Sequence, residues 1–274
     1  MKKILVPTDF SDNARHAMEY AIAFGDVDAH YVLMNSYESP NVGGSGAFIS
    51  MEEILEKEAK KDLKREEVRI KKEHPDLSFE CYPIYGSIET GINRVRSRLE
   101  IDFLVMGTQG ATGMKEFVFG SNTQHVLENY MHPMIAVPEN FEFKGIKNIV
   151  FAADFHKLKN DDSLLPLVSI AKKFQAHIHV VHISEGTKDL GANTNENMEH
   201  LKEILSNVSY STHVIQGEEI AASLHNYAEK VSADMTVLMP RNLSFFNKLF
   251  TSQVSKDMAY HATRPLLILH DVKS

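Results

Sequence analysis

The segment ILVPTDF, residues 4–10, returns later in the chain as IVFAADF, residues 149–155. Two further segments recur in the same order, with DFLVM at 102–106 matched by DMTVL at 234–238 and PMIAV at 133–137 matched by PLLIL at 265–269. Self-similarity of this kind indicates an internal duplication. We therefore expect two domains, residues 1–140 and residues 146–274.

Short apolar runs alternate with helical patterns in both copies. The first copy predicts strands at 2–7, 30–36, 78–84, 102–107 and 134–138 and helices at 12–24, 51–73, 88–98 and 121–130. The second predicts strands at 148–154, 177–183, 209–215, 234–239 and 266–270 and helices at 161–174, 195–206, 218–231 and 252–261. Such alternation is typical of a parallel sheet with helices on both faces. The expected fold class is α/β, with two tandem open five-stranded parallel sheets related by a pseudo-twofold.

Composition and charge narrow the function classes. The 274 residues are enough for two cores, and 43% of them are hydrophobic. The formal net charge of −8 argues against a general grip on nucleic acid or on an anionic membrane. Cys81 is the single cysteine, so no intrachain disulfide can form, and no apolar run approaches the length of a membrane helix. We expect a cytoplasmic protein.

The segment MGTQGATGMKEFVFGSN, residues 106–122, follows an apolar run and precedes a helical pattern. Glycine lets backbone amides approach an anion closely, and a helix N-terminus adds partial positive charge. Ligands of open parallel sheets bind beyond the carboxyl ends of the strands, where Pro7, Thr8 and Asp9 also lie. The pattern predicts a phosphate-binding loop, and a connector that merely turns the chain is the alternative.

With these motifs the sequence resembles the universal stress protein family over both halves. ATP-binding members carry glycine, two residues, glycine, nine residues, glycine and then serine or threonine, a spacing that Gly107, Gly110, Gly120 and Ser121 meet. The resemblance implies an adenine nucleotide alpha hydrolase-like, Rossmann-like fold with ATP lying across the strand ends. The ATP-binding residues that it implies are Pro7, Thr8, Asp9, Ser36, Met106, Gly107, Gly110, Gly120, Ser121 and Asn122.

Each group has an expected role by this resemblance. Thr8 and Asp9 would lie near the ribose and adenine, and the backbone around Ser36 would read the adenine edge. The phosphates would be bound by Gly110, Gly120, Ser121 and Asn122. A magnesium ion would bridge the phosphate oxygens.

The second copy departs from the ATP-binding pattern. The loop glycines are replaced by Met239, Asn242 and Thr251, and the bulky side chains of Phe245, Phe246 and Phe250 occupy the loop. Pro7-Thr8 has become Ala152-Ala153, although Asp154 is retained. We expect ATP in the N-terminal domain only, with the second domain structural or recognising another ligand. We also expect the last strands of the two copies to pair and so to cover their edges, with a homodimer through this edge as the alternative.

No Walker-type loop follows any apolar run, and no GxGxxG follows the first strand. His177 and His179 share one face of a predicted strand and His182 points the other way, so a metal site there is weakly supported. No catalytic constellation is indicated. Three functions remain: a nucleotide-dependent stress-response regulator with an unknown protein partner, a nucleotide-free interaction module, and a slow ATP hydrolase.

Overall fold

The computed structural model describes residues 2–25, 27–38, 48–108, 120–155, 157–184, 194–217, 220–240 and 263–272. The chain divides into two compact units. The first comprises Met1–Met114 and Phe119–Val126, and the second comprises Lys115–Val118 and Leu127–Ser274. Among the described helices, none is both long and apolar enough to cross a membrane.

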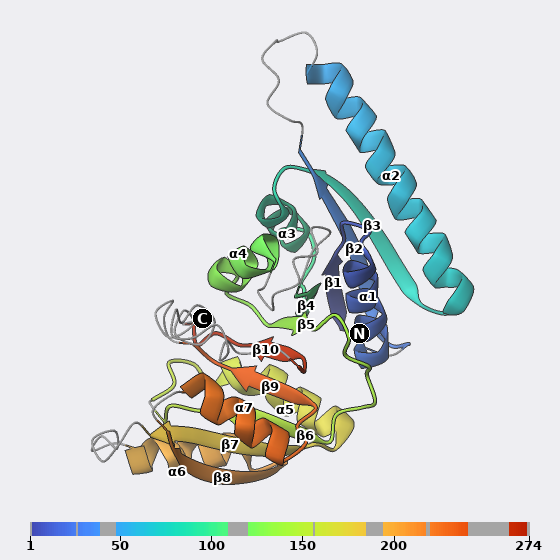
Figure 1. Ribbon diagram of the computed structural model, residues 1–274. Helices are drawn as coiled ribbons and strands as arrows, with labels where there is room; N and C mark the ends of the chain where they lie inside the picture. The colour runs from blue at the N-terminus through green and yellow to red at the C-terminus, as the bar shows by residue number, and fades with distance from the viewer. Residues whose placement is uncertain are drawn as a thin grey trace. The chain divides into compact units, whose positions relative to one another are not determined.

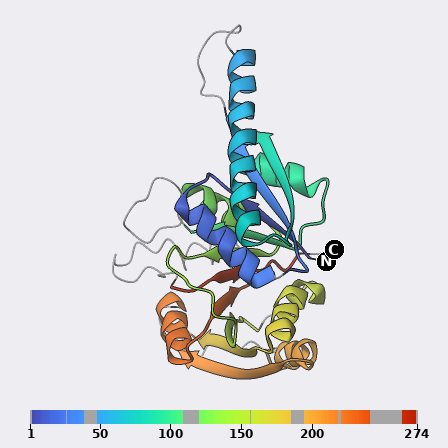
Figure 2. The same ribbon diagram turned by 90° about the vertical axis from the view of Figure 1, so that its right-hand side faces the viewer.

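The first unit contains a parallel sheet with helices on both faces (Figure 1). Its strands are β1 (Lys3–Pro7), β2 (His30–Tyr37), β3 (Ser78–Tyr85) and β4 (Phe103–Gly107), in the order β3-β2-β1-β4. Its helices are α1 (Asp12–Gly25), α2 (Phe48–Glu73), α3 (Ile88–Arg96) and the first turns of α4 (Ser121–Asn129). The helices α1 and α2 cover one face, and α3 and α4 cover the other (Figures 1 and 2).

Apolar runs explain the centre of this sheet. All the side chains of Ile4, Leu5 and Leu104 are 0% exposed, because β1 and β4 have helices on both faces. Such strands carry no polar alternate face, which is why they are continuous apolar runs in the sequence. The α/β class predicted from those runs is confirmed.

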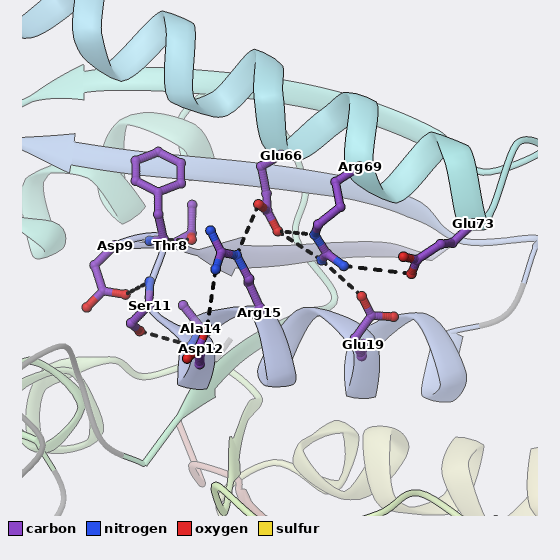
Figure 3. A network of polar contacts seen from close by, with 11 residues as sticks. Thr8, Asp9, Ser11, Asp12, Ala14, Arg15, Glu19, Glu66, Arg69 and Glu73 are labelled. Atoms are coloured by element: carbon purple, nitrogen blue, oxygen red, sulfur yellow. Dashed lines mark hydrogen bonds and ion pairs between the residues drawn. The ribbon is translucent and has the colours of Figure 1, made fainter.

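Ion pairs join α1 to α2 on the same face of the sheet (Figure 3). Glu66 is 5% exposed and its carboxylate accepts from Arg15 Nε at 3.3 Å and from Arg69 Nε at 2.9 Å. Arg69 also donates to Glu19 at 3.0 Å. Two guanidinium groups hold the buried Glu66 carboxylate of α2. The bond from Arg15 thereby fixes α1, the helix that follows β1, against α2.

Six of the described strands belong to the second unit. Its strands are β5 (Met134–Val137), β6 (Asn148–Ala152), β7 (His177–Ser184), β8 (Ser209–Gln216), β9 (Met235–Leu238) and β10 (Leu266–Ile268), in the order β5-β10-β9-β6-β7-β8. Its helices are α5 (Leu165–Phe174), α6 (Thr194–Leu205) and α7 (Ile220–Lys230). Figure 2 shows α7 on one face and α5 and α6 on the other.

The last strands of the two repeats pair with each other in this second unit. β10 is antiparallel to β5, with Leu267 opposite Ile135, and is parallel to β9. The edge of the second repeat is therefore covered by the end of the first, as predicted.

The two repeats also share backbone details. The Asp102 carboxylate accepts a hydrogen bond from the Lys3 amide at 2.8 Å, and the Asp102 amide donates to the Lys3 carbonyl at 2.9 Å. Asp234 makes the same pair of bonds with Asn148, at 2.9 and 2.8 Å. The same carboxylate clamp holds the start of the first strand in each copy.

One expected helix differs in its first turn. The segment 161–174 begins as a 3₁₀ turn, Asp161–Leu164, and becomes α-helical at α5. Pro166 lacks the amide that a continuous α-helix would need at this position. The helix expected at 252–261 lies outside the described residues.

Candidate functional site

A cavity of about 290 Å³ opens where β1, β2 and β4 end, beside the first turn of α4. Nine predicted residues line it: Pro7, Thr8, Asp9, Ser36, Met106, Gly107, Gly120, Ser121 and Asn122. The tenth, Gly110, lies outside the described residues. Segments that are far apart in sequence thus meet at one edge of the sheet, while their role in binding remains a prediction.

Four further residues line the cavity that sequence reasoning missed: Ala14, Met34, Ile88 and Thr123. Two of them could have been found from the sequence. Met34 lies two positions before Ser36, on the same face of the strand, and Thr123 lies two positions after Ser121, in the same helical turn. Ala14 and Ile88 are apolar residues in the first turns of helices. In the sequence they cannot be distinguished from core residues.

The turn between β1 and α1 is held by three hydrogen bonds that backbone amides donate to side-chain oxygens (Figure 3). Thr8 Oγ1 accepts from the Phe10 amide at 3.0 Å, and Asp9 Oδ1 accepts from the Ser11 amide at 3.0 Å. Ser11 Oγ accepts from the Ala14 amide at 3.2 Å and so caps α1. These bonds stabilise the left-handed conformation of Phe10, whose φ is 63°. Asp9 stands exposed at the cavity rim on a fixed backbone.

The start of α4 forms the opposite wall. The Gly120 amide donates to the Thr108 carbonyl at 2.6 Å, and Thr123 Oγ1 donates to the Gly107 carbonyl at 2.8 Å. The Gly120 amide, which the family pattern assigns to phosphate, is therefore bonded to the end of β4. The next three amides belong to the first turn of α4, where no carbonyl one turn earlier in the helix can accept from them. An anion at this wall would meet the amides of 121–123.

Gly107 has a steric reason to be glycine. A Cβ at this position would lie 2.3 Å from Asn13 Nδ2 and 2.6 Å from Asn13 Cγ. Asn13 is 5% exposed, so its side chain is enclosed by its neighbours. The glycine lets the end of β4 approach α1 closely on the cavity floor.

The lining has two chemical characters. Its apolar part comes from Pro7, Ala14, Met34, Ile88 and Met106. Its polar part comes from Thr8, Asp9, Ser36, Ser121, Asn122 and Thr123. Such a cavity can hold a ligand with a flat apolar portion and an anionic portion, which suits a nucleotide better than an apolar metabolite.

Only part of the equivalent region in the second repeat is described. Ala152, Ala153, Asp154 and Met239 are described, and Met239 takes the position of Gly107. The loop positions Asn242, Phe245, Phe246, Phe250 and Thr251 lie outside the described residues. The expectation that this repeat binds no ATP therefore remains a prediction.

The chain is similar to known proteins in both sequence and structure. Universal stress protein MJ0577 of Methanocaldococcus jannaschii is 30% identical over 152 residues, which span 50% of this chain and 94% of that protein. A universal stress protein structure from Archaeoglobus fulgidus DSM 4304 matches with a TM-score of 0.68 at 18% identity and covers 98% of both chains. A putative universal stress protein from Pseudomonas aeruginosa UCBPP-PA14 matches with a TM-score of 0.60 at 14% identity, covering 98% of this chain and 93% of that one.

Neither structural match exceeds 18% identity, so these two matches speak for the fold alone. The family assignment rests on the sequence. The profile of the universal stress protein family matches residues 1–138 and again residues 145–270, which accounts for nearly the whole chain. The chain therefore belongs to the universal stress protein family, with two copies of the family domain in tandem.

Proposed function

We propose that this chain is a cytoplasmic, nucleotide-dependent regulator of the stress response that binds ATP with magnesium in its N-terminal repeat only. The observation that carries the proposal is the cavity at the strand ends. It combines an apolar wall, an exposed carboxylate at its rim and the first turn of a nine-residue helix. Adenine, ribose and phosphate each have a matching surface there.

The cavity suggests one orientation for ATP. The adenine would lie against Met34, Ile88 and Met106, with Asp9 near the ribose hydroxyls. The phosphates would lie at the start of α4, where the helix dipole and the amides of 121–123 favour negative charge. Ser121 and Asn122 offer oxygen atoms of the kind that magnesium prefers. When bound, the ion would neutralise part of the phosphate charge.

Binding would act as a signal through linkage. A ligand at 100 times its dissociation constant stabilises the bound state by about 2.7 kcal/mol, which is enough to shift a conformational equilibrium that a protein partner reads. Regulation in this sense needs no turnover.

The variant Ser121→Asp tests the site. A carboxylate at the first residue of α4 favours the helix dipole but repels phosphate, so the helix should hold while ATP binding weakens at least about tenfold. The measurement is calorimetric titration of nucleotide-stripped protein with ATP and magnesium, with adenosine as a second ligand. Adenosine should lose much less affinity, because it carries no phosphate.

Asn160→Asp is the matched control. It makes a similar change of charge at a helix start in the second repeat, where the Asn160 side chain accepts from the Asp162 amide. This variant should bind ATP as the wild type does. The proposal fails if the wild type does not bind millimolar ATP, or if Ser121→Asp binds ATP with unchanged affinity.

Acid extraction of the freshly purified chain separates the proposal from its alternatives. ATP recovered whole supports a regulator. AMP would instead indicate a catalyst, either a hydrolase or an adenylyl-transfer enzyme. Recovery of no nucleotide, together with failed titration, would indicate a nucleotide-free interaction module.

A further inference from the structure

Three imidazoles surround one hydroxyl group on the α7 face of the second repeat's sheet. The oxygen of Ser211 lies 2.9 Å from His177 Nε2, 2.8 Å from His213 Nε2 and 3.5 Å from His179 Nδ1. His177 and His179 come from β7, and Ser211 and His213 from the neighbouring β8. We call His177, His179 and His213 the histidine cluster.

The hydrogen bonds of the cluster are unequal. A serine hydroxyl has one hydrogen and two lone pairs, so Ser211 can serve three imidazoles only if two donate and one accepts. His179 is the most loosely held, with its contacts to Ser211, Asn148 and Tyr227 all between 3.4 and 3.5 Å. Its ring can therefore change partners at small energetic cost.

The surroundings of His179 favour its neutral form. Burial, with further contributions from His177 and His213, lowers the pKa of His179 below its usual value. A metal ion requires a neutral imidazole, because the protonated ring has no free lone pair.

The first repeat shows that the fold does not require this cluster. Glu80 takes the place of Ser211 there, and its carboxylate accepts from Tyr82 and, at 3.0 Å, pairs with His30. Tyr82 and Val32 stand where the second repeat has His213 and His179. The shared frame thus carries one imidazole and a carboxylate in the first copy, and three imidazoles around a hydroxyl in the second.

We propose that the histidine cluster binds a divalent transition-metal ion of the zinc class. The three nitrogens lie around the Ser211 oxygen, 2.8–3.5 Å from it. Bonds of 2.0–2.1 Å to a zinc ion in its place would require them to move inward by roughly 0.7–1.5 Å while the Ser211 hydroxyl turns aside. The three rings are partly exposed, which leaves a path for the ion. Imidazole nitrogen is a preferred ligand of zinc, copper and nickel, whereas magnesium and calcium prefer oxygen.

A second group of ligand atoms, from Glu19, Glu73 and His74 in the first unit, is the competing location. Arg69 reaches into that group, with its guanidinium 3.0 Å from Glu19 and 3.7 Å from Glu73. Its positive charge neutralises these carboxylates and opposes a cation. Within the described part of the chain, the hydrogen-bond partners of the histidine cluster are all neutral groups.

The test is calorimetric titration of the full chain, free of any affinity tag and of nucleotide, with Zn²⁺ at pH 7.5. We expect one ion per chain. His179→Val and His213→Tyr install the residues of the first repeat, and each should weaken binding at least about 100-fold, since loss of even an outer partner of a ligand costs 10–100-fold. Ser211→Ala keeps all three ligands and should bind zinc as well as the wild type.

His200→Gln is the control, because His200 is also half-exposed in the second repeat but pairs with Asp161 at 2.8 Å. It should leave zinc affinity unchanged. Histidine NMR of the wild type gives a readout that needs no variant: zinc should shift the ring nitrogens of His177, His179 and His213. Absence of one-to-one binding, unchanged affinity in His179→Val and His213→Tyr, or loss of binding in His74→Gln would each overturn the proposal. The nucleotide titrations are independent of all these outcomes.

Discussion

Where their first strands end, the two repeats share a backbone turn but carry different side chains on it. In the first, the Thr8 amide donates to the Met34 carbonyl at 2.8 Å, and in the second the Ala153 amide donates to the Val181 carbonyl at 2.9 Å. Phe10 and Phe155 follow with positive φ values of 63° and 49°. The backbone turn has therefore been preserved while the side chains on it have changed.

The changed side chains alter what the turn can hold. Asn35 donates to the Thr8 carbonyl at 2.7 Å, and His182 lies 3.0 Å from the Ala153 carbonyl in the same place. Phe155 is 5% exposed, and its ring packs 4.9 Å from that of His182. The fold is therefore set by a backbone frame common to both repeats, whereas the chemistry at the strand ends depends on a few side chains.

We expect the greatest change in stability at one position in the centre of each sheet. Leu104 on β4 and Thr236 on β9 are equivalent, and both are 0% exposed. Within the described residues, the Thr236 hydroxyl has no hydrogen-bond partner. Leu104→Ala should lower the free energy of unfolding by about 2–5 kcal/mol, because it leaves a cavity. Thr236→Val should raise it by about 1 kcal/mol, because it removes an unpaired buried polar group.

Urea unfolding at pH 7, followed by circular dichroism, measures both changes. Exposed Thr212 provides the control, since Thr212→Val on β8 should change stability by less than about 0.5 kcal/mol. If Thr236→Val destabilises the chain, the hydroxyl must have a partner and the two sheet centres are equally well satisfied.

Much of this frame could be predicted from the sequence. Buried parallel strands are continuous apolar runs, so the predicted strands and most of the predicted helices agree with the structure to within a few residues. The recurrence of ILVPTDF as IVFAADF predicts the duplication. The 3₁₀ turn Asp161–Leu164, which precedes α5, was not predicted, because it depends on Pro166 together with several neighbouring residues.

The site was less accessible to sequence reasoning. Glycine spacing and strand ends pointed to nine residues of the cavity lining, but the engagement of the Gly120 amide with Thr108 depends on how the chain returns from the loop to α4. The histidine cluster needed the register of two strands. His213 lies opposite Val181, two positions beyond His179, and no local pattern in the sequence reveals that pairing.

The second prediction concerns acid sensitivity, which we expect to be stronger in the second repeat. Burial, with a further contribution from His132, lowers the pKa of His270 to about 4, and Pro138 occupies the equivalent place in the first repeat. The unfolded chain binds a proton at His270 near pH 6.5, whereas the folded chain does not until about pH 4. Stability should therefore be full above pH 6.5 and fall on acidification, by about 2–3 kcal/mol from this group.

His270→Gln removes the titration but keeps a polar side chain. The loss of unfolding free energy between pH 7 and pH 4.5 should be about 2 kcal/mol smaller in this variant than in the wild type. His125→Gln is the control, because His125 pairs with Glu89 at an exposed site. Equal losses in the wild type and in His270→Gln would show that His270 protonates without cost, and would remove this difference between the repeats.

A milder change, Thr8→Ala, tests whether the strand-end turn of the first repeat can be converted into that of the second. Thr8→Ala reproduces Ala153 and removes the hydroxyl that accepts from the Phe10 amide at 3.0 Å. Loss of one such bond should cost about 1 kcal/mol, and the backbone turn should survive because the Thr8 amide remains bonded to Met34. ATP affinity should fall less than in Ser121→Asp, because in the proposed orientation Ser121 would face the phosphates, whereas Thr8 would only position the cavity rim. The reverse change, Ala153→Thr, should create no ATP site, which calorimetry of a Ser121→Asp background would reveal. Recovery of ATP binding there would mean that a single hydroxyl, rather than the whole strand-end lining, separates the two repeats.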